Sequence, residues 1–152
     1  MPKLTNNERS PYTDVIRLTA ADLIAIGNGG TRQIATIPAG GAVTLCAVTE
    51  TIAVAGSTSL VVDVGTTIAT PTEFISTLDV DASTTGLPTF NTGTAFVQGA
   101  GTTTIKGGVL PVGAASAETK VYIKVTDAAV ASITAGEILV GLAIIDLTQY
   151  RV

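Results

Sequence analysis

The side chains that could carry out chemistry in this chain are few, and the most versatile of them is missing. The 152 residues include no histidine. Histidine is the commonest general base and a frequent metal ligand, so its absence excludes His-based catalytic triads and His-ligated metal centres. Acid–base or nucleophilic chemistry would have to depend on the carboxylates and on the single cysteine.

Asp79 and Asp81 lie on the same side of a predicted strand or loop, with Thr84 and Thr85 close by. A calcium site is conceivable there, but the spacing lacks the ligand series of an EF-hand. A glycosidase needs paired acids in a cleft, usually with aromatic residues that stack against sugars. The chain has only three Phe, three Tyr and no Trp. We therefore interpret both residues as solvated loop acids; carboxylates that only folding brings together are the remaining enzymatic alternative.

Cys46 lies in the apolar run Val43-Thr44-Leu45-Cys46-Ala47-Val48 and has no second cysteine to pair with. A nucleophilic thiol needs a basic, partly exposed setting, so we predict a buried, unreactive side chain instead. The loop Gly27-Asn28-Gly29-Gly30 is not followed by the Lys-Ser/Thr of a phosphate-binding loop. We expect no catalytic, cofactor-binding or metal-binding residue, and no enzymatic activity.

The charge pattern argues against nucleic acid as a partner. The net charge is −4, and the eight Lys and Arg residues are scattered rather than clustered. Lys120 and Lys124 are close together, but they fall on the polar face of a predicted strand, where solvent covers them. Charged residues make up only 13% of the chain, against about a quarter in typical domains. A surface so poor in charge indicates either coverage by neighbouring subunits or a very stable extracellular β domain.

Residues 1–11 are polar, contain two prolines and predict an extended N-terminal arm, followed by one domain over residues 12–152. The first residues lack the apolar core of a signal peptide, so we expect synthesis in a cytoplasm. The uncharged stretch 82–105 is too rich in Thr, Gly and Pro for a membrane helix. We expect no membrane partner.

Most of the remaining chain predicts short strands separated by turn signals. Strands are expected over residues 12–18, 31–37, 42–54, 59–64, 77–81, 120–126 and 137–147, with short pieces near residues 95–97 and 103–105. Thr19 with Asp22 resembles a capping box and predicts one short helical turn to Ile26. Thr70, Pro71 and Glu73 predict a second turn, ending near residue 77. About eight strands with two helical turns predict an all-β fold, a single Greek-key or jelly-roll β-sandwich.

Two strands depart from simple alternation. The apolar residues change parity between Leu45 and Val48, which predicts a bulge or a strand that is apolar on both faces. The last strand is apolar on both faces, so it is either central in the sandwich or half core and half subunit interface. One face carries Ile138, Val140, Leu142 and Ile144, and the other Leu139, Ala143, Ile145 and Leu147.

The order of these elements resembles that of the small jelly-roll-like capsid decoration (cement) proteins of tailed bacteriophages, or of related head and tail accessory proteins. The resemblance covers most of residues 12–147. It is carried by Ile34-Ala35-Thr36-Ile37-Pro38-Ala39-Gly40, by Leu60-Val61-Val62-Asp63-Val64-Gly65, by Pro71-Thr72-Glu73-Phe74-Ile75, by the strand over residues 120–126, and by Ile133-Thr134-Ala135-Gly136-Glu137-Ile138-Leu139-Val140.

The resemblance implies a homotrimer on the outside of an icosahedral shell, where it bridges neighbouring major capsid subunits. It carries over no catalytic residue, and the motifs Pro38-Ala39-Gly40 and Thr134-Ala135-Gly136-Glu137 would be turn chemistry. We expect the N-terminal arm to attach the protein to the particle. A phage tail-fibre or receptor-binding head domain is the alternative, and it would favour clustered aromatic residues in loops. A cellular surface or adhesin-type domain is a third possibility.

Overall fold

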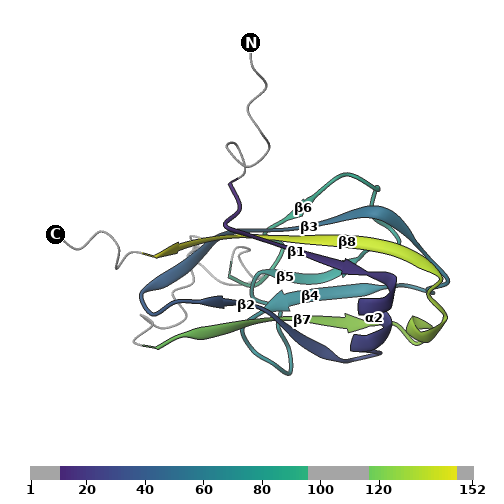
Figure 1. Ribbon diagram of the computed structural model, residues 1–152, viewed down its shortest axis with the longest axis horizontal. Coiled ribbons are helices and arrows are strands. Elements are labelled where there is room, and N and C mark those ends of the chain that lie inside the picture. The colour runs from purple at the N-terminus through teal and green to yellow at the C-terminus, as the bar shows by residue number, and fades with distance from the viewer. Residues whose placement is uncertain (1–10, 96–116, 147–152) are drawn as a thin grey trace, which may run out of the picture.

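Two four-stranded antiparallel sheets pack face to face in the computed structural model, which describes residues 11–95 and 117–146 (Figure 1). Sheet A has the strand order β1-β8-β3-β6, and sheet B has the order β2-β7-β4-β5. The strands are β1 (Asp14–Thr19), β2 (Thr31–Ile37), β3 (Gly41–Ala55), β4 (Val61–Gly65), β5 (Ile75–Asp79), β6 (Thr89–Phe90), β7 (Thr119–Thr126) and β8 (Ala135–Asp146). Helix α2 (Ala20–Ile26) follows β1, and the 3-10 turn η1 (Val130–Ser132) precedes β8.

The strand pairing is nested. β1 pairs with β8, β2 with β7, β3 with β6 and β4 with β5, all antiparallel. Eight strands paired in this way form a double-sheet jelly roll. The predicted all-β sandwich is therefore confirmed.

Alternating side chains explain how each sheet supplies half of the core. In β7, Val121, Ile123 and Val125 are fully buried, and the residues between them are not. In β8, Ile138, Val140 and Leu142 are fully buried on the inner face. The β7 alternation and the inner face of β8 confirm the expected pattern.

The long strand β3 contains the irregularity that its sequence predicts. Val43 pairs with Ile144 and Leu45 with Ala143, so Thr44 is an extra residue in the β3–β8 ladder. Beyond it Cys46, Ala47 and Val48 are all buried. The bulge at Thr44 lies just before the predicted stretch from Leu45 to Val48, and within that stretch the second alternative holds, because apolar residues lie on both faces.

Helix α2 begins as predicted, with Thr19 as its N-cap. The Thr19 backbone N–H donates to Asp22 Oδ2 at 3.0 Å, and the Asp22 N–H donates to Thr19 Oγ1 at 3.4 Å, which makes a reciprocal capping box. The helix ends at Gly27, whose φ of 79° suits glycine. Leu23 of the helix is completely buried, so the helix packs against the core.

The helical turn predicted at residues 70–77 is wrong. Glu73 does not cap a helix; it accepts hydrogen bonds from the Thr66 N–H at 2.9 Å and from the Thr67 hydroxyl. Phe74 and Ile75 are fully buried, and β5 begins at Ile75. Burial of these two apolar side chains between the sheets outweighs a local capping signal that stabilises a helix by about 1 kcal/mol.

Other differences concern element boundaries. The strand expected over residues 77–81 lies at Ile75–Asp79, and the two-residue strand β6 was not predicted. Residues 1–10 of the predicted arm, the expected β-like pieces at 96–97 and 103–105, and Leu147 lie outside the described residues.

Candidate functional site

The outer side of sheet A carries a continuous apolar surface. Because neighbouring residues of a strand point to opposite faces, burial of Ile138, Val140 and Leu142 turns the residues between them outward. The register then places Val15 of β1 and Ala47 of β3 on either side of Gly141. We define the apolar face as six outward residues: Val15, Leu45, Ala47, Leu139, Ala143 and Ile145.

Two large apolar side chains on this face are exposed, Leu45 and Leu139 are half-buried, and the alanines are buried. Val15 is 57% exposed and Ile145 is 37% exposed, while Ala47 and Ala143 are buried. Phe90 of the short edge strand β6 pairs with Ala47 and is 47% exposed. Several exposed apolar side chains gathered on one sheet face mark an interaction surface more often than a solvated one.

A shallow groove of about 200 Å³ runs through the centre of the apolar face. Gly141, the residue of this part of β8 without a side chain, is one of its lining residues. The walls are Tyr12, Val15, Ala47, Thr49 and Leu139. All of them except the Thr49 hydroxyl and the Tyr12 phenol present carbon to the groove, so it suits an apolar occupant.

Tyr12 shapes this groove because its ring lies directly over Gly141. A Cβ at position 141 would come within 2.7 Å of Tyr12 Cδ1 and 2.8 Å of Cε1, so only glycine fits under the ring. Partial burial, and to a smaller extent the Cys46 thiol, raises the pKa of Tyr12. The close approach explains why a glycine interrupts an otherwise apolar strand.

Thr13 directs Tyr12 onto the sheet. The Thr13 N–H continues the β1–β8 ladder by donating to the Leu142 carbonyl at 2.8 Å. The Thr13 hydroxyl then accepts a hydrogen bond from the Ile144 N–H at 3.0 Å. This N–H would otherwise donate to the next backbone carbonyl in the ladder. The backbone ladder therefore ends at Thr13, and Tyr12 lies across the outer surface instead of beside β8.

One ion pair borders the apolar face. Arg17 Nε donates to Glu137 Oε2 at 2.6 Å, and the Thr51 hydroxyl donates to Glu137 Oε1 at 2.8 Å. Arg17 and then Thr51 lower the pKa of Glu137, and Glu137 raises the pKa of Arg17. Because the two charges neutralise each other, this border of the face carries no net charge.

The outer side of sheet B has the opposite chemistry. Its central strand β7 turns Lys120, Tyr122 and Lys124 outward, as the sequence predicts. Asp63 of β4 pairs with Lys124 in the register and accepts the Thr77 N–H at 2.6 Å. Asp63 is buried and Lys124 Nζ donates to the Ala69 carbonyl at 3.2 Å, so this face is polar and partly covered by a loop.

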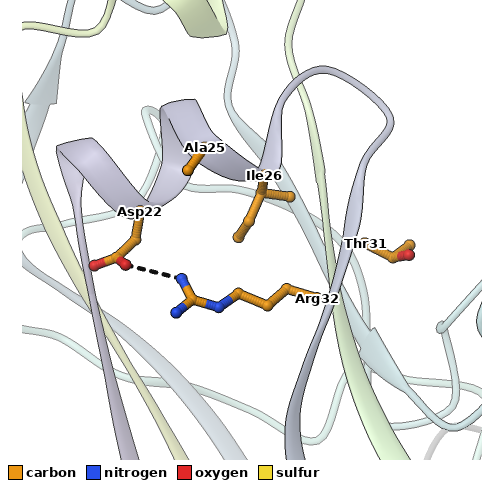
Figure 2. A pocket seen from close by; sticks show the side chains of 5 residues that line it. All are labelled: Asp22, Ala25, Ile26, Thr31 and Arg32. Carbon is orange, nitrogen blue, oxygen red and sulfur yellow. Dashed lines mark hydrogen bonds and ion pairs between the residues drawn. The ribbon is translucent and has the colours of Figure 1, made fainter.

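A second hollow, of about 310 Å³, lies between α2 and β2 (Figure 2). Asp22 and Arg32 meet across it at 2.8 Å, with Ala25, Ile26 and Thr31 around them. Hydrogen bonds from Arg32 and then Thr19 lower the pKa of Asp22 to about 2. Both charges are already partnered, so we interpret the pair as a link between the two sheets rather than as a ligand site.

The buried carboxylates hold loops, and the sequence did not indicate them. Glu50 accepts the Val54 N–H at 2.8 Å and the Thr85 hydroxyl at 2.7 Å. Asp127 accepts the N–H groups of Thr58 and Ala129 at 3.0 and 2.9 Å. Every buried side-chain nitrogen or oxygen among the described residues has a hydrogen-bond partner.

Asp79 and Asp81 both face the loop that precedes β4. The Ser59 hydroxyl donates to Asp79 at 2.9 Å, and Asp81 accepts the Leu60 N–H at 2.9 Å and the Ser57 hydroxyl at 2.8 Å. The two carboxylates therefore tie this loop to the end of β5. Within residues 11–95 and 117–146, no group of three or more His, Cys, Asp or Glu side chains could hold a metal ion.

Cys46 points into the core and is fully buried. Burial in apolar surroundings raises the pKa of its thiol well above the ordinary value. The prediction of a buried cysteine is confirmed.

The sequence predicted part of the apolar face. It singled out Leu139, Ala143 and Ile145 as a surplus apolar side of the last strand, but it did not place Tyr12 or Val15 beside them. Gly141 was the available signal, because a glycine inside an apolar strand marks the close approach of another group. What approaches it could not be read from the pattern.

No helix in the described part of the chain is long and apolar enough to span a membrane. A scan against models of protein families, a search of curated proteins and a search of solved structures found no match to this chain.

Proposed function

We propose that this chain is a non-enzymatic structural protein of a tailed-phage virion. In this proposal it is a capsid decoration, or cement, protein that binds the outer shell and stabilises contacts between major capsid subunits. The observation that carries the proposal is the apolar face of sheet A. It is an exposed interaction surface on a small sandwich whose core is already complete.

The apolar face favours an assembly function because a sandwich needs only one apolar face per sheet. Sheet A has two, and the second exposes Val15, Phe90 and Ile145 to water. Contact with another protein would remove this surface from solvent, at about 25 cal/mol for each Å² of apolar area. A homotrimer is the arrangement that the resemblance implies.

The carboxylates support a structural function over a catalytic one. Glu50, Glu73, Asp79, Asp81 and Asp127 all accept hydrogen bonds from loop N–H or hydroxyl groups. A general acid or base must be accessible to its substrate, whereas these groups are engaged in holding loops.

Of the two motifs expected to be turn chemistry, Pro38-Ala39-Gly40 forms a turn, whereas Ala135-Gly136-Glu137 of the other lies in strand β8. In Pro38-Ala39-Gly40 the Gly41 N–H donates to the Pro38 carbonyl at 2.8 Å, and Gly40 has a φ of 77°. Gly136 has a φ of 143° at the start of β8. Eight-stranded jelly rolls occur in viral capsid proteins and in lectins, so the fold is compatible with the proposal.

The partners follow from the surface. The major capsid protein and other copies of this chain are proposed, while nucleic acid and membranes are not. Arg17 and Arg32 are engaged in ion pairs with Glu137 and Asp22 rather than available for phosphates. The proposed location is the capsid surface.

Electron cryomicroscopy of virions of the phage that encodes the chain would test this proposal. We expect density for the sandwich on the outer shell, between major capsid subunits. Density confined to the tail tip would contradict the proposal and support the tail-fibre alternative.

The N-terminal arm gives a second test with the same particles. We expect a chain lacking residues 1–11 to fold with little change in melting temperature but to occupy particles less fully. Particles that carry it should rupture at a lower temperature. Occupancy equal to that of the full chain would show that the arm is not an anchor, and loss of folding would show that it belongs to the domain.

A further inference from the structure

We infer that the copies of the proposed homo-oligomer contact one another through the apolar face of sheet A, with a second copy of this chain as the occupant of its groove. This inference rests on the proposed function for the existence of the oligomer. It adds the surface that forms the contact and the residues that decide it.

Charge favours a second copy as the occupant. The six residues of the apolar face carry no charge, and the bordering Arg17 and Glu137 neutralise each other. A basic or acidic partner would therefore leave its own charges buried without counter-charges, which is strongly unfavourable. The sheet A of another copy presents a neutral, apolar surface of the same area. The sheet B of that copy presents Lys120 and Lys124 instead.

The size of the face also suits association between copies. At about 3.3 Å per residue and about 4.8 Å between strands, sheet A offers an outer face of roughly 500–600 Å². A standard interface buries about 800 Å² on each partner. The sheet alone therefore supplies most of one interface, and flanking residues such as Tyr12 enlarge it.

The shape of the face is complementary to exposed aliphatic side chains. Ala47 and the Tyr12 ring over Gly141 line the groove, and Val15 stands exposed at its side. The groove of about 200 Å³ has room for one side chain of the size of Val or Ile. A neighbouring copy presents exposed aliphatic side chains of this size on the outer side of its own sheet A.

Sedimentation of the full-length chain, with variants of matched position on the two sheets, tests the inference. Val15→Glu on the edge strand β1 is compared with Gln33→Glu on the edge strand β2. Leu139→Glu on the central strand β8 is compared with Tyr122→Glu on the central strand β7. In each pair, one variant places a new carboxylate on the outer side of sheet A and the other places one on the outer side of sheet B.

We expect the wild type and the two sheet B variants to sediment as the same homo-oligomer at tens of micromolar. Two faces that cover each other give a dimer, and three faces that meet around one axis give the trimer that the resemblance implies. Val15→Glu should raise the dissociation constant at least about 100-fold, because a buried unpaired charge is strongly unfavourable. Leu139→Glu lies opposite Arg17 in the register and should raise it by a smaller factor. Circular dichroism checks folding, and the uncharged Val15→Ser replaces either variant that fails to fold; it should weaken association by a smaller factor.

Two results would overturn the inference, and they differ in what they say of the proposed function. If Val15→Glu, Leu139→Glu and Val15→Ser sediment as the wild-type oligomer, the copies meet through another surface and the capsid role stands. If the wild type is a monomer in solution and shows no clustering on particles, no contact between copies exists. Capsid occupancy then tests the function by itself.

Discussion

On the outside of sheet B the central strand β7 presents Lys120 and Lys124, whereas on the outside of sheet A the central strand β8 presents Leu139 and Ala143. The inner sides of the same strands are alike, with Ile123 and similar aliphatic residues fully buried. Both strands are central and flanked on each side by hydrogen-bonded neighbours. Backbone pairing therefore does not explain the difference in their outer side chains.

The difference identifies the outer side of sheet A as the surface on which the proposed assembly depends. Folding alone needs one apolar side per strand, and β7 has one. The second apolar side of β8 adds nothing to the core between the sheets. These outward side chains contribute favourable free energy only when another surface covers them. The polar outer side of sheet B is the reference for the comparison.

The largest expected effects lie on the inner faces, where the two sheets should respond equally. Ile123→Ala in β7 and Leu142→Ala in β8 should each reduce the free energy of unfolding by about 2–5 kcal/mol, because both residues are fully buried. Urea denaturation measures the losses. Leu139→Ala is the control, because Leu139 lies on the outer face of β8; it should reduce the free energy of unfolding by less. A larger loss for Leu139→Ala than for Leu142→Ala would invert the assigned faces of β8.

Gly141→Ala should have the next largest effect, on sheet A alone. Its Cβ would overlap the Tyr12 ring, so the ring must leave the surface, at about 1–3 kcal/mol. Thermal unfolding measures the loss. In a Tyr12→Ala background the same substitution should cost little, because its obstacle is gone. Equal losses in both backgrounds would mean that Tyr12 does not lie on Gly141.

Asp22→Asn tests the link between the sheets through the pH dependence of its effect on stability. The pKa of Asp22 is about 2 in the folded protein, below its ordinary value of 3.8. Such a group stabilises the folded state above its unfolded pKa, and the stabilisation is lost as pH falls through the folded value. The variant should therefore be less stable by about 1 kcal/mol at pH 7, as expected for a weakened helix cap.

Thermal unfolding between pH 7 and pH 2 measures this difference. It should shrink as the pH falls from about 4 towards 2. Asp14→Asn, an exposed acid on the neighbouring strand, is the control and should show a smaller change. A constant difference over the whole range would mean that the Asp22 charge does not contribute.

The smallest effect is expected at Cys46. It is buried and its pKa is raised, so a thiol reagent should not label it in the folded protein. Cys46→Ala should cost about 1 kcal/mol at most. Full labelling in urea is the positive control. Fast labelling under native conditions would place Cys46 on the outer side of β3.

Strands with a strong local pattern were predictable from the sequence. The range of β2 is the predicted one, and Val121, Ile123 and Val125 face inward as their alternation indicates. The Thr19 capping box formed because both of its partners are local. In these places the nearest neighbours in sequence decide the structure.

What depends on distant partners could not be predicted. Glu73 shows a helix-start signal, but burial of Phe74 and Ile75 between the two sheets overrides it. Glu50 resembles any strand acid until folding brings Thr85 to it. The candidate site divides in the same way: the apolar parity of β8 is local, whereas the position of Tyr12 over Gly141 depends on a pairing between the two ends of the domain.

The nested pairing also has a consequence for the order of folding. Thr13 and Leu142, which are hydrogen-bonded at the end of the β1–β8 ladder, are 129 residues apart in sequence. β1 and most of β3 both pair with β8, the last strand in sequence. Sheet A therefore cannot form until the chain has been synthesised through β8. Pairings over such distances make folding slow and leave apolar strands exposed meanwhile. During that interval β3 is open to solvent on both of its apolar faces, and misassembly competes with closure of the sandwich.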